Sequence, residues 1–305
     1  MKVYASVENA IGNTPLVRLK KTEKAHALKG RLYAKLEGTN AGGSIKDRVA
    51  KYMLDEAEKS GALQKGGTVI EPTSGNTGVG LALVAAARGY QAVIVMPDGM
   101  SVERRKLIAA YGAKIVLTDG EKGMQGAVDK ADELLTQTPN AIIAGQFENP
   151  ANPKAHYETT APEIYQALEG KVDAFVAGVG TGGTLTGVGR YLKEKAPRSK
   201  VYAVEPAASP LLSGGKAGPH AIQGIGANFI PKVLDRSVYD EVLTVTDEDA
   251  LSAMRALGKT EGIFAGVSSG AALAAAIELA KRNEYEGKNI VMVLPDDGGR
   301  YLSIL

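Results

Sequence analysis

The chain has 305 residues, of which 44% are hydrophobic and 23% charged, and its formal net charge is +2 at pH 7. These values are ordinary for a globular protein and give no sign of a nucleic-acid or membrane partner. Because the chain has no cysteine, disulfides, thiolate metal sites and a cysteine nucleophile are excluded. It also lacks a long apolar run and an apolar signal core, so we expect a cytoplasmic protein without membrane helices.

Short apolar segments alternate along the chain with segments of helical period. The predicted strands are 31–37, 68–72, 91–96, 113–118, 140–145, 173–178, 200–206, 241–245 and 289–295. The predicted helices are 46–60, 76–88, 102–111, 123–136, 184–195, 247–258 and 269–282. Apolar strands that are each followed by a helix predict parallel sheets covered on both faces, which is an α/β fold.

Glycine-rich loops follow several of these strands, and the chain has 37 glycines. A single such loop is often only a tight turn. Because ligands bind at the carboxyl ends of parallel strands, several of these loops together indicate a binding site. The loops are 42–48, 73–80, 178–184 and 266–272. The segment 145–156, rich in Asn and Pro, is the best candidate for a domain boundary.

The loop 178–184 comes after a predicted strand and opens a predicted helix. Its glycines free the backbone, and Thr181 and Thr184 add hydroxyl groups. Such neutral donors at a helix N-terminus suit a phosphate dianion. The loop also fits G-x-G-x-x-G, and Glu205 ends the next strand, where a dinucleotide enzyme holds a ribose. An NAD-linked oxidoreductase using Gly178, Gly180, Gly183 and Glu205 therefore remains open.

Lys46 stands at the predicted start of a helix, directly after the glycine-rich segment 42–45. A solvated lysine is unfavourable there because the helix N-terminus is its positive end. Desolvation lowers the pKa of a lysine, and condensation of the amine with an aldehyde forms an imine. The alternative is a surface lysine paired with Glu37 or Asp47. Beside a phosphate site, the lysine favours pyridoxal 5′-phosphate.

The loop 73–77 crowds hydroxyls and backbone donors at another predicted helix start. Thr73, Ser74 and Thr77 are suited to bind a carboxylate, and Asn76 can direct its amide at a ring oxygen. The alternative is a helix cap formed by Ser74 or Asn76. Ser268, which precedes an alanine-rich helix, has the same alternative.

Several motifs together resemble a known family. They are "IGNTPLVRL", "GGSIKDR", "EPTSGNTG", "GTGGT", "GVSSGAA" and "IQGIGANFIP", and they stand in the order typical of fold-type II pyridoxal-phosphate enzymes. Within that class the chain resembles the cysteine synthases (O-acetylserine sulfhydrylases) of the A type, from about residue 8 to 303. It departs from their pattern at Ala41, Asp297 and Gly299, which lie outside the reaction chemistry.

The resemblance implies the fold of the tryptophan synthase β-subunit, with two domains that each have a mainly parallel sheet flanked by helices. The smaller domain would be 40–145 and would carry the loop 73–77. The larger domain would be 1–39 plus 146–305 and would carry the phosphate cup, residues 180–184.

The resemblance also implies residue roles. Lys46 would hold the cofactor and move a proton at the substrate α-carbon, Asn76 would bond the ring oxygen, and Ser268 would face the pyridine nitrogen. The phosphate would be held by Gly180, Thr181, Gly182, Gly183 and Thr184. The substrate carboxylate would be held by Thr73, Ser74, Thr77 and Gln146. The site entrance would be lined by Gly224, Ile225 and Gly226.

The reaction implied is β-replacement on O-acetyl-L-serine by sulfide, through an aminoacrylate intermediate, giving L-cysteine and acetate. A cystathionine β-synthase-type reaction with homocysteine stays open, as does a catalytically quiet binding protein. The resemblance further implies a homodimer and, as a partner, a serine acetyltransferase whose C-terminal tail enters the site. We expect no metal, because His26, His156 and His220 lack metal-ligand spacing.

Overall fold

The computed structural model describes residues 3–99 and 102–304, and the chain forms two compact units. The smaller unit comprises the segment that ends at Ile11 together with Asn40–Asn152, and the larger comprises Gly12–Thr39 and the chain from Pro153 onward. Each unit has its own sheet and its own core. The expected domains differ from these units in the N-terminal segment and in residues 146–152, which lie with the smaller unit.

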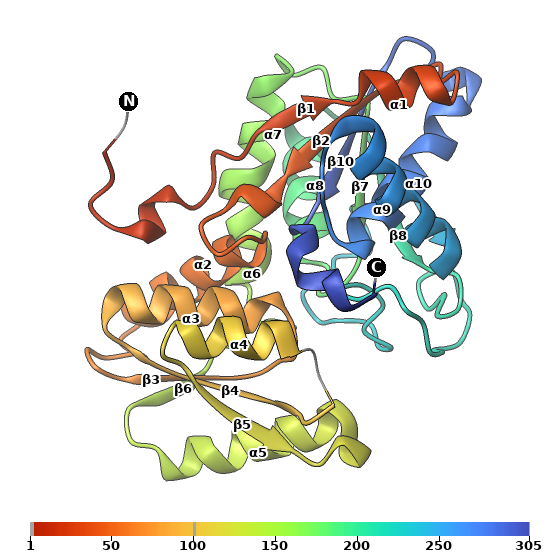
Figure 1. Ribbon diagram of the computed structural model, residues 1–305. Coiled ribbons are helices and arrows are strands. Elements are labelled where there is room, and N and C mark those ends of the chain that lie inside the picture. The colour runs from red at the N-terminus through yellow and green to blue at the C-terminus, as the bar shows by residue number, and fades with distance from the viewer. Residues whose placement is uncertain (1–2, 100–101, 305) are drawn as a thin grey trace. The chain divides into compact units, whose positions relative to one another are not determined.

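The smaller unit is built on a parallel four-stranded sheet in the order β5-β4-β3-β6 (Figure 1). Ile70 and Val95 pack on one face with two alanines of α5, whereas Val69 and Ile94 pack on the other with α2 and α3. This alternation is the period of two that the strand pattern predicts. The elements are α2 (Lys46–Lys59), β3 (Thr68–Pro72), α3 (Asn76–Arg88), β4 (Gln91–Pro97), α4 (Val102–Ala110), β5 (Lys114–Thr118), α5 (Gly123–Gln137) and β6 (Ala141–Ile143).

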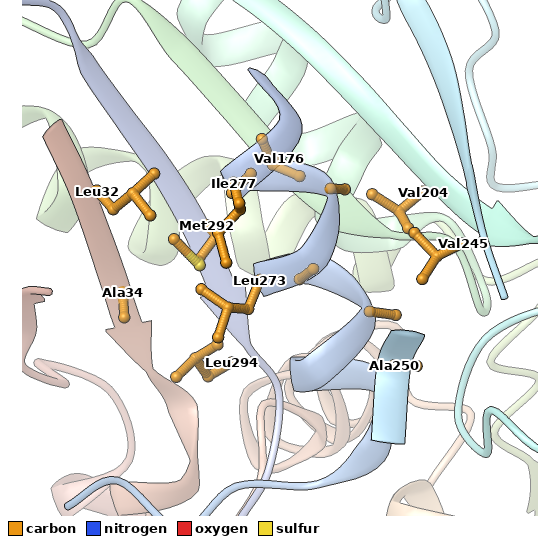
Figure 2. Packing of buried hydrophobic residues seen from close by; sticks show 14 of the residues in the cluster. Leu32, Ala34, Val176, Val204, Val245, Ala250, Leu273, Ile277, Met292 and Leu294 are labelled. Atoms are coloured by element: carbon orange, nitrogen blue, oxygen red, sulfur yellow. The ribbon is translucent and has the colours of Figure 1, made fainter. Parts of the chain in front are cut away.

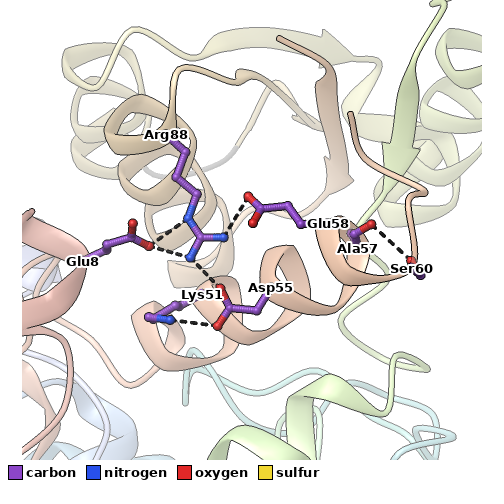
Figure 3. A network of polar contacts seen from close by, with 7 residues as sticks. All are labelled: Glu8, Lys51, Asp55, Ala57, Glu58, Ser60 and Arg88. Carbon is purple, nitrogen blue, oxygen red and sulfur yellow. Dashed lines mark hydrogen bonds and ion pairs between the residues drawn. The ribbon is translucent and has the colours of Figure 1, made fainter. Parts of the chain in front are cut away.

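An ion-pair network joins the N-terminal segment to the helices of the smaller unit. Figure 3 shows the guanidinium of Arg88, at the end of α3, between Glu8 and two acidic side chains of α2. The N···O distances are 2.5 Å to Glu8, 2.6 Å to Asp55 and 3.0 Å to Glu58. Burial opposes the charge on Arg88, but its hydrogen bonds to Glu8 and Asp55 raise its pKa.

The larger unit has a six-stranded sheet in the order β1-β2-β10-β7-β8-β9, parallel except for the antiparallel pair β1–β2 (Figure 1). Its strands are β1 (Leu16–Arg18), β2 (Arg31–Leu36), β7 (Ala174–Gly178), β8 (Lys200–Pro206), β9 (Glu241–Val245) and β10 (Asn289–Leu294). Its helices are α1 (Lys20–Ala25), α7 (Ala161–Ala167), α8 (Gly183–Lys195), α9 (Asp247–Glu261) and α10 (Val267–Lys281), and α6 (Ala151–Ala155) crosses the unit boundary.

The core of the larger unit lies between its sheet and α10. Figure 2 shows Leu273 and Ile277 of α10 directed toward side chains of the strands, among them Val176, Met292 and Leu294. The many alanines of α10 are buried, so the helix lies close to the sheet and to α9. None of the described helices is long and apolar enough to cross a bilayer.

The predicted α/β fold is confirmed, and every predicted strand and helix is present with small shifts at its ends. The last predicted helix begins at Val267, two residues earlier than expected. Strand β6 ends at Ile143, before Gly145, whose φ of +69° turns the chain. Among the strands and α-helices named above, those not predicted are short or contain proline. They are β1, α1, α6 and α7. Pro153 lies in the first turn of α6, where a missing N–H costs nothing.

Candidate active site

Lys46 is the first residue of α2, as the sequence predicted. Its backbone N–H donates to Ser44 Oγ at 3.2 Å, and the Asp47 carboxylate accepts the N–H of Gly42 at 2.6 Å. These two bonds close the loop 42–47 and fix the direction in which α2 begins. Lys46 is therefore held at the positive end of a helix, where an ordinary surface lysine is unfavourable.

Helix α3 lies directly against the first turn of α2. Gly80 of α3 provides the contact, because a Cβ added there would lie only 2.9 Å from the carbonyl oxygen of Lys46. Real Cβ atoms do not approach a backbone oxygen so closely, so the two helices could not stay as close with a larger residue. The contact places Lys46 beside the helix that begins with Asn76.

The loop between β3 and α3 contains the predicted carboxylate-binding residues. Thr73 Oγ1 accepts the N–H of Gly75 at 3.2 Å, and Gly75 occupies the N-cap position of α3. Neither Ser74 nor Asn76 is therefore the N-cap, and the capping alternative for them is wrong. The hydroxyl and N–H groups at the start of α3 therefore lie in a tight turn at the carboxyl end of β3. Parallel sheets bind ligands at this end of their strands.

Gln146 lies beside this loop in the smaller unit. Thr77 Oγ1 donates to Gln146 Oε1 at 2.6 Å, and both side chains are buried. Glu71, at the end of β3, accepts the backbone N–H groups of Gly145 and Gln146. The structure thus brings Thr77 and Gln146 together. Glu71 was missed, although a charged residue in the apolar strand "TVIEP" was a signal that could have identified it.

The predicted phosphate cup lies in the larger unit, between β7 and α8. Gly182 is the N-cap of α8 with φ of +83°, a conformation that favours glycine. The N–H of Gly183 donates to Thr181 Oγ1 at 3.3 Å. A Cβ on Gly180 would clash with the carbonyl oxygen of Gly224, so only glycine allows this close approach.

A buried histidine contacts the hydroxyl group of the cup. Thr184 Oγ1 lies 3.2 Å from His156 Nε2, and His156 Nδ1 lies 2.9 Å from Thr160 Oγ1. His156 was considered only as a possible metal ligand, so this contact was missed. No local sequence signal connects positions 156 and 184, because the contact depends on the packing of α8 against the segment 156–160.

Ser268 lies in the first turn of α10 and is only 3% exposed. Gly266 holds the N-cap position there, so the capping alternative for Ser268 is wrong. A Cβ on Gly224 would lie 3.6 Å from Ser268 Oγ, and Ile225 packs against Gly178. The larger unit therefore brings Gly180, Gly224, Ile225 and Ser268 together.

The NAD-linked alternative is not supported. The carboxylate of Glu205 accepts the N–H groups of Leu212 at 2.7 Å and Ser213 at 2.9 Å. These bonds use the Glu205 carboxylate to hold the loop that contains Leu212 and Ser213. Helix α8 also begins at Gly183, the last glycine of the motif, whereas a dinucleotide-binding helix opens nearer the first ones.

The residues fit the cofactor that the resemblance implies. The cup combines backbone donors with a helix N-terminus, which suit a phosphate, and added Cβ atoms on Gly180 and Gly182 would clash with Gly224 and Leu234. The larger unit also has the buried hydroxyl of Ser268. The smaller unit, taken by itself, has Lys46 at a helix start and a loop rich in donors.

Comparisons with known proteins agree with this assignment. A family model described as "Pyridoxal-phosphate dependent enzyme" matches residues 7–296. A cysteine synthase of Staphylococcus aureus is 52% identical over 303 residues, which are 99% of this chain and 96% of the relative. The crystal structure of a cysteine synthase from Entamoeba histolytica has a TM-score of 0.96 and 44% identity, covering 99% of this chain and 90% of that one. An O-ureido-L-serine synthase has a TM-score of 0.95 and 47% identity, covering 100% of this chain and 95% of that one. The chain belongs to the family of pyridoxal-phosphate dependent enzymes.

Proposed function

We propose that the chain is a cysteine synthase, which replaces the acetate group of O-acetyl-L-serine with sulfide to give L-cysteine and acetate. The observation that carries the proposal is the glycine cup at the start of α8, with Ser268 near its Gly224 wall, in a chain 52% identical to a cysteine synthase. In the reaction the bond from the β-carbon to acetate breaks and a carbon–sulfur bond forms. The α-proton is removed and later returned.

Lys46 carries the central role in this proposal. When bound, pyridoxal phosphate withdraws electrons from the α-carbon of an amino acid, so that the α-proton becomes acidic and a β-substituent can leave. Lys46 holds the cofactor through its side-chain nitrogen, and its amine, once released, takes the α-proton and gives it back. General base action of this kind typically contributes about 10²- to 10⁴-fold in rate.

The loop 73–77 and Gln146 bind the substrate carboxylate in this proposal. Their hydroxyl and amide donors hold the amino acid so that its α C–H bond is directed toward the base. The buried hydrogen bond from Thr77 to Gln146 supports this role, because it fixes the Gln146 amide beforehand, so that little entropy is lost on binding.

Ser268 sets the electronic character of the cofactor ring in this proposal, with Asn76 donating to the ring oxygen. A neutral serine hydroxyl near the pyridine nitrogen does not favour its protonation as an aspartate would. The ring then withdraws electrons less strongly, which favours rapid loss of the β-substituent over a long-lived carbanion.

Sulfide is not the only nucleophile that could take part in such a β-replacement. The O-ureido-L-serine synthase is 47% identical to this chain, so relatives this similar form different β-substituted products. Homocysteine, which would give a cystathionine β-synthase-type reaction, is a second candidate. Sulfide is favoured because two similar relatives are named cysteine synthases.

The test is product analysis of the purified protein loaded with pyridoxal phosphate. O-acetyl-L-serine is supplied with sulfide, with homocysteine or with hydroxyurea, and serine replaces O-acetyl-L-serine in a parallel series. We expect L-cysteine as the dominant product and a pyridoxyl adduct on Lys46 after borohydride reduction. Faster formation of cystathionine or of O-ureido-L-serine would show that homocysteine or hydroxyurea, and not sulfide, is the preferred nucleophile. The absence of a pyridoxyl adduct on Lys46 in the loaded protein would refute the proposal.

We further propose that the enzyme is a cytoplasmic homodimer that binds the C-terminal tail of a serine acetyltransferase. The resemblance to the A-type family supports these statements. Native mass measurement tests the dimer. Binding of a synthetic acetyltransferase tail peptide, competed by O-acetyl-L-serine, tests the partner.

A further inference from the structure

Glu71 is a buried carboxylate that has no part in the reaction described above. It is 1% exposed and stands next to the last residue of β3, two residues before Thr73. Glutamate is rarely buried without a specific set of partners. Its partners therefore indicate what the side chain does.

The partners of Glu71 all belong to the turn after β6. Oε2 accepts the N–H of Gly145 at 2.7 Å, and Oε1 accepts the N–H of Gln146 at 3.2 Å. The side-chain amide of Gln146 also acts on this carboxylate and lowers its pKa. Because β6 pairs with β3 in the sheet, one carboxylate reaches two backbone N–H groups of the neighbouring loop.

These contacts determine how the amide of Gln146 is oriented. Its Oε1 accepts the hydroxyl proton of Thr77 at 2.6 Å, and its backbone carbonyl accepts Asn152 Nδ2 at 2.8 Å. An ionised carboxylate can only accept hydrogen bonds, so it forces the –NH₂ group of Gln146 to its own side. One of the two amide hydrogens then faces the Glu71 side, and the second is directed toward a ligand.

We propose that Glu71 is a positioning residue that fixes the amide of Gln146 with its N–H directed at the substrate carboxylate. This inference rests on the proposed function, in which Gln146 binds that carboxylate. Without an ionised carboxylate at position 71, the Gln146 amide can turn over, because a neutral group there can also donate a hydrogen bond. It then presents Oε1 to the substrate, and two oxygens repel each other where a hydrogen bond had formed.

The ionisation of Glu71 supports this role. Burial raises the pKa of the Glu71 carboxyl to about 7. The hydrogen bonds from Gly145 and Gln146 lower this pKa in part, and the negative charge of Glu148 raises it further. Glu148 is an exposed side chain in the loop after β6. A protonated Glu71 has an O–H that can donate to Gln146 Oε1, so the amide orientation is secure only when the carboxylate is ionised.

The experiment measures steady-state kinetics for O-acetyl-L-serine between pH 6 and 8.5. We compare the wild type with Glu71→Gln, Glu71→Asp and the control Glu148→Gln. We expect Glu71→Gln to raise KM about 10- to 100-fold, as for the loss of one hydrogen bond to a charged group, and to change kcat less than about threefold. In the wild type KM should rise as pH falls through about 7, whereas Glu71→Gln should have the high KM throughout.

The other variants separate positioning from a structural effect. Glu71→Asp keeps a carboxylate, which when ionised can only accept hydrogen bonds, and should restore part of the affinity. Glu148→Gln should keep the wild-type KM at pH 8 and shift the pH midpoint downward, because a negative charge near Glu71 is removed. Amide hydrogen exchange of the peptide that spans 144–147, measured without substrate, should be faster in Glu71→Gln.

Two results would overturn the inference. One is an unchanged KM and unchanged amide exchange in Glu71→Gln. The other is an equal fall of kcat and kcat/KM without any change in pH dependence. If the wild type makes no cysteine, the proposed function fails separately, and the exchange experiment still reports whether Glu71 holds the turn.

Discussion

Gly180 shows how much of the site depends on the absence of one methyl group. The carbonyl oxygen of Gly224 occupies the place where a Cβ would project. This approach joins the loop 224–226 to the phosphate cup, and the N–H of Gly226 bonds the carbonyl of Val179 at 3.0 Å beside it. The proposed cup and the proposed site entrance are therefore held together by direct backbone contacts.

Gly180→Ala should lower the affinity for pyridoxal phosphate about 5- to 150-fold, because the loop 224–226 must move away from the cup. Overpacking of this kind costs about 1–3 kcal/mol. Titration of the cofactor-free protein, followed by absorbance, measures this. Gly258→Ala in α9 is the matched control, since its Cβ would meet only the Ile263 carbonyl oxygen at 3.9 Å. Equal affinities in the two variants would contradict the prediction.

Glu71 also makes stability depend on pH. Burial raises its pKa in the folded protein to about 7, from an ordinary value of 4.5. Between these values the folded state holds a proton that the unfolded state has lost. Increasing pH therefore lowers the free energy of unfolding across this window, and the loss is complete above the folded-state pKa.

The side chain of Glu71→Gln is neutral at every pH, so this variant should not lose free energy of unfolding as the pH rises. For the wild type a pKa shift of this size corresponds to a loss of about 3 kcal/mol. Urea unfolding at pH 5 and pH 8 measures it. The wild type should lose about 2–3 kcal/mol more than the variant between the two pH values. Parallel pH dependences of the two proteins would show that Glu71 does not titrate in this range.

Helices α2 and α3 form a pair whose close contact places Lys46, the proposed catalytic lysine. Gly80 permits it, since an added Cβ would meet the Lys46 carbonyl at 2.9 Å and the Ala50 Cβ at 3.2 Å. The loop 42–47 holds the start of α2 from the other side, through Ser44 and Asp47. The position of Lys46 is thus a property of two packed helices.

Gly80→Ala should destabilise the protein by about 1–3 kcal/mol through overpacking, although alanine is the better helix former. It should also slow cysteine formation, because the backbone of Lys46 is displaced. Gly258→Ala lies inside a helix without this contact and should stabilise by about 0.5–1 kcal/mol. Denaturant unfolding of both variants tests the contrast, and a stabilised Gly80→Ala would be inconsistent with a tight contact.

Across the whole molecule, the chain forms two units that are not continuous in sequence. The N-terminal segment belongs to the smaller unit, although the residues that follow it, Gly12–Thr39, belong to the larger. The Arg88 network accounts for this, because it fixes Glu8 to α3 and α2 with an arginine side chain that is only 12% exposed. Ion pairs of this kind contribute more than exposed ones, since solvent screens them less.

Arg88→Ala should lower the free energy of unfolding by about 1–3 kcal/mol, because three carboxylates lose their common partner. Cleavage by subtilisin within residues 3–11 should become faster. Arg190→Ala removes a pair whose arginine is 52% exposed, and it should cost less than about 1 kcal/mol. Equal losses in the two variants would mean that the Arg88 network does not hold the segment.

The sequence by itself determined the features that neighbouring residues encode. Apolar runs and helical periods predicted the strands and helices, and the start of α2 at Lys46 followed from the glycines before it. The residues proposed for the phosphate cup and the carboxylate loop could be named for the same reason, because each group lies within one short glycine-rich segment. Such patterns predict local structure because they reflect preferences of residues close together in the chain.

Only the tertiary structure decided contacts between distant residues. Glu71 reaches a turn 74 residues away because β6 pairs with β3, and no local pattern specifies which strands become neighbours. The contact between His156 and Thr184 and the attachment of Glu8 to Arg88 were hidden for the same reason. The pKa of Glu71 likewise follows from burial, which depends on packing by segments far away in sequence.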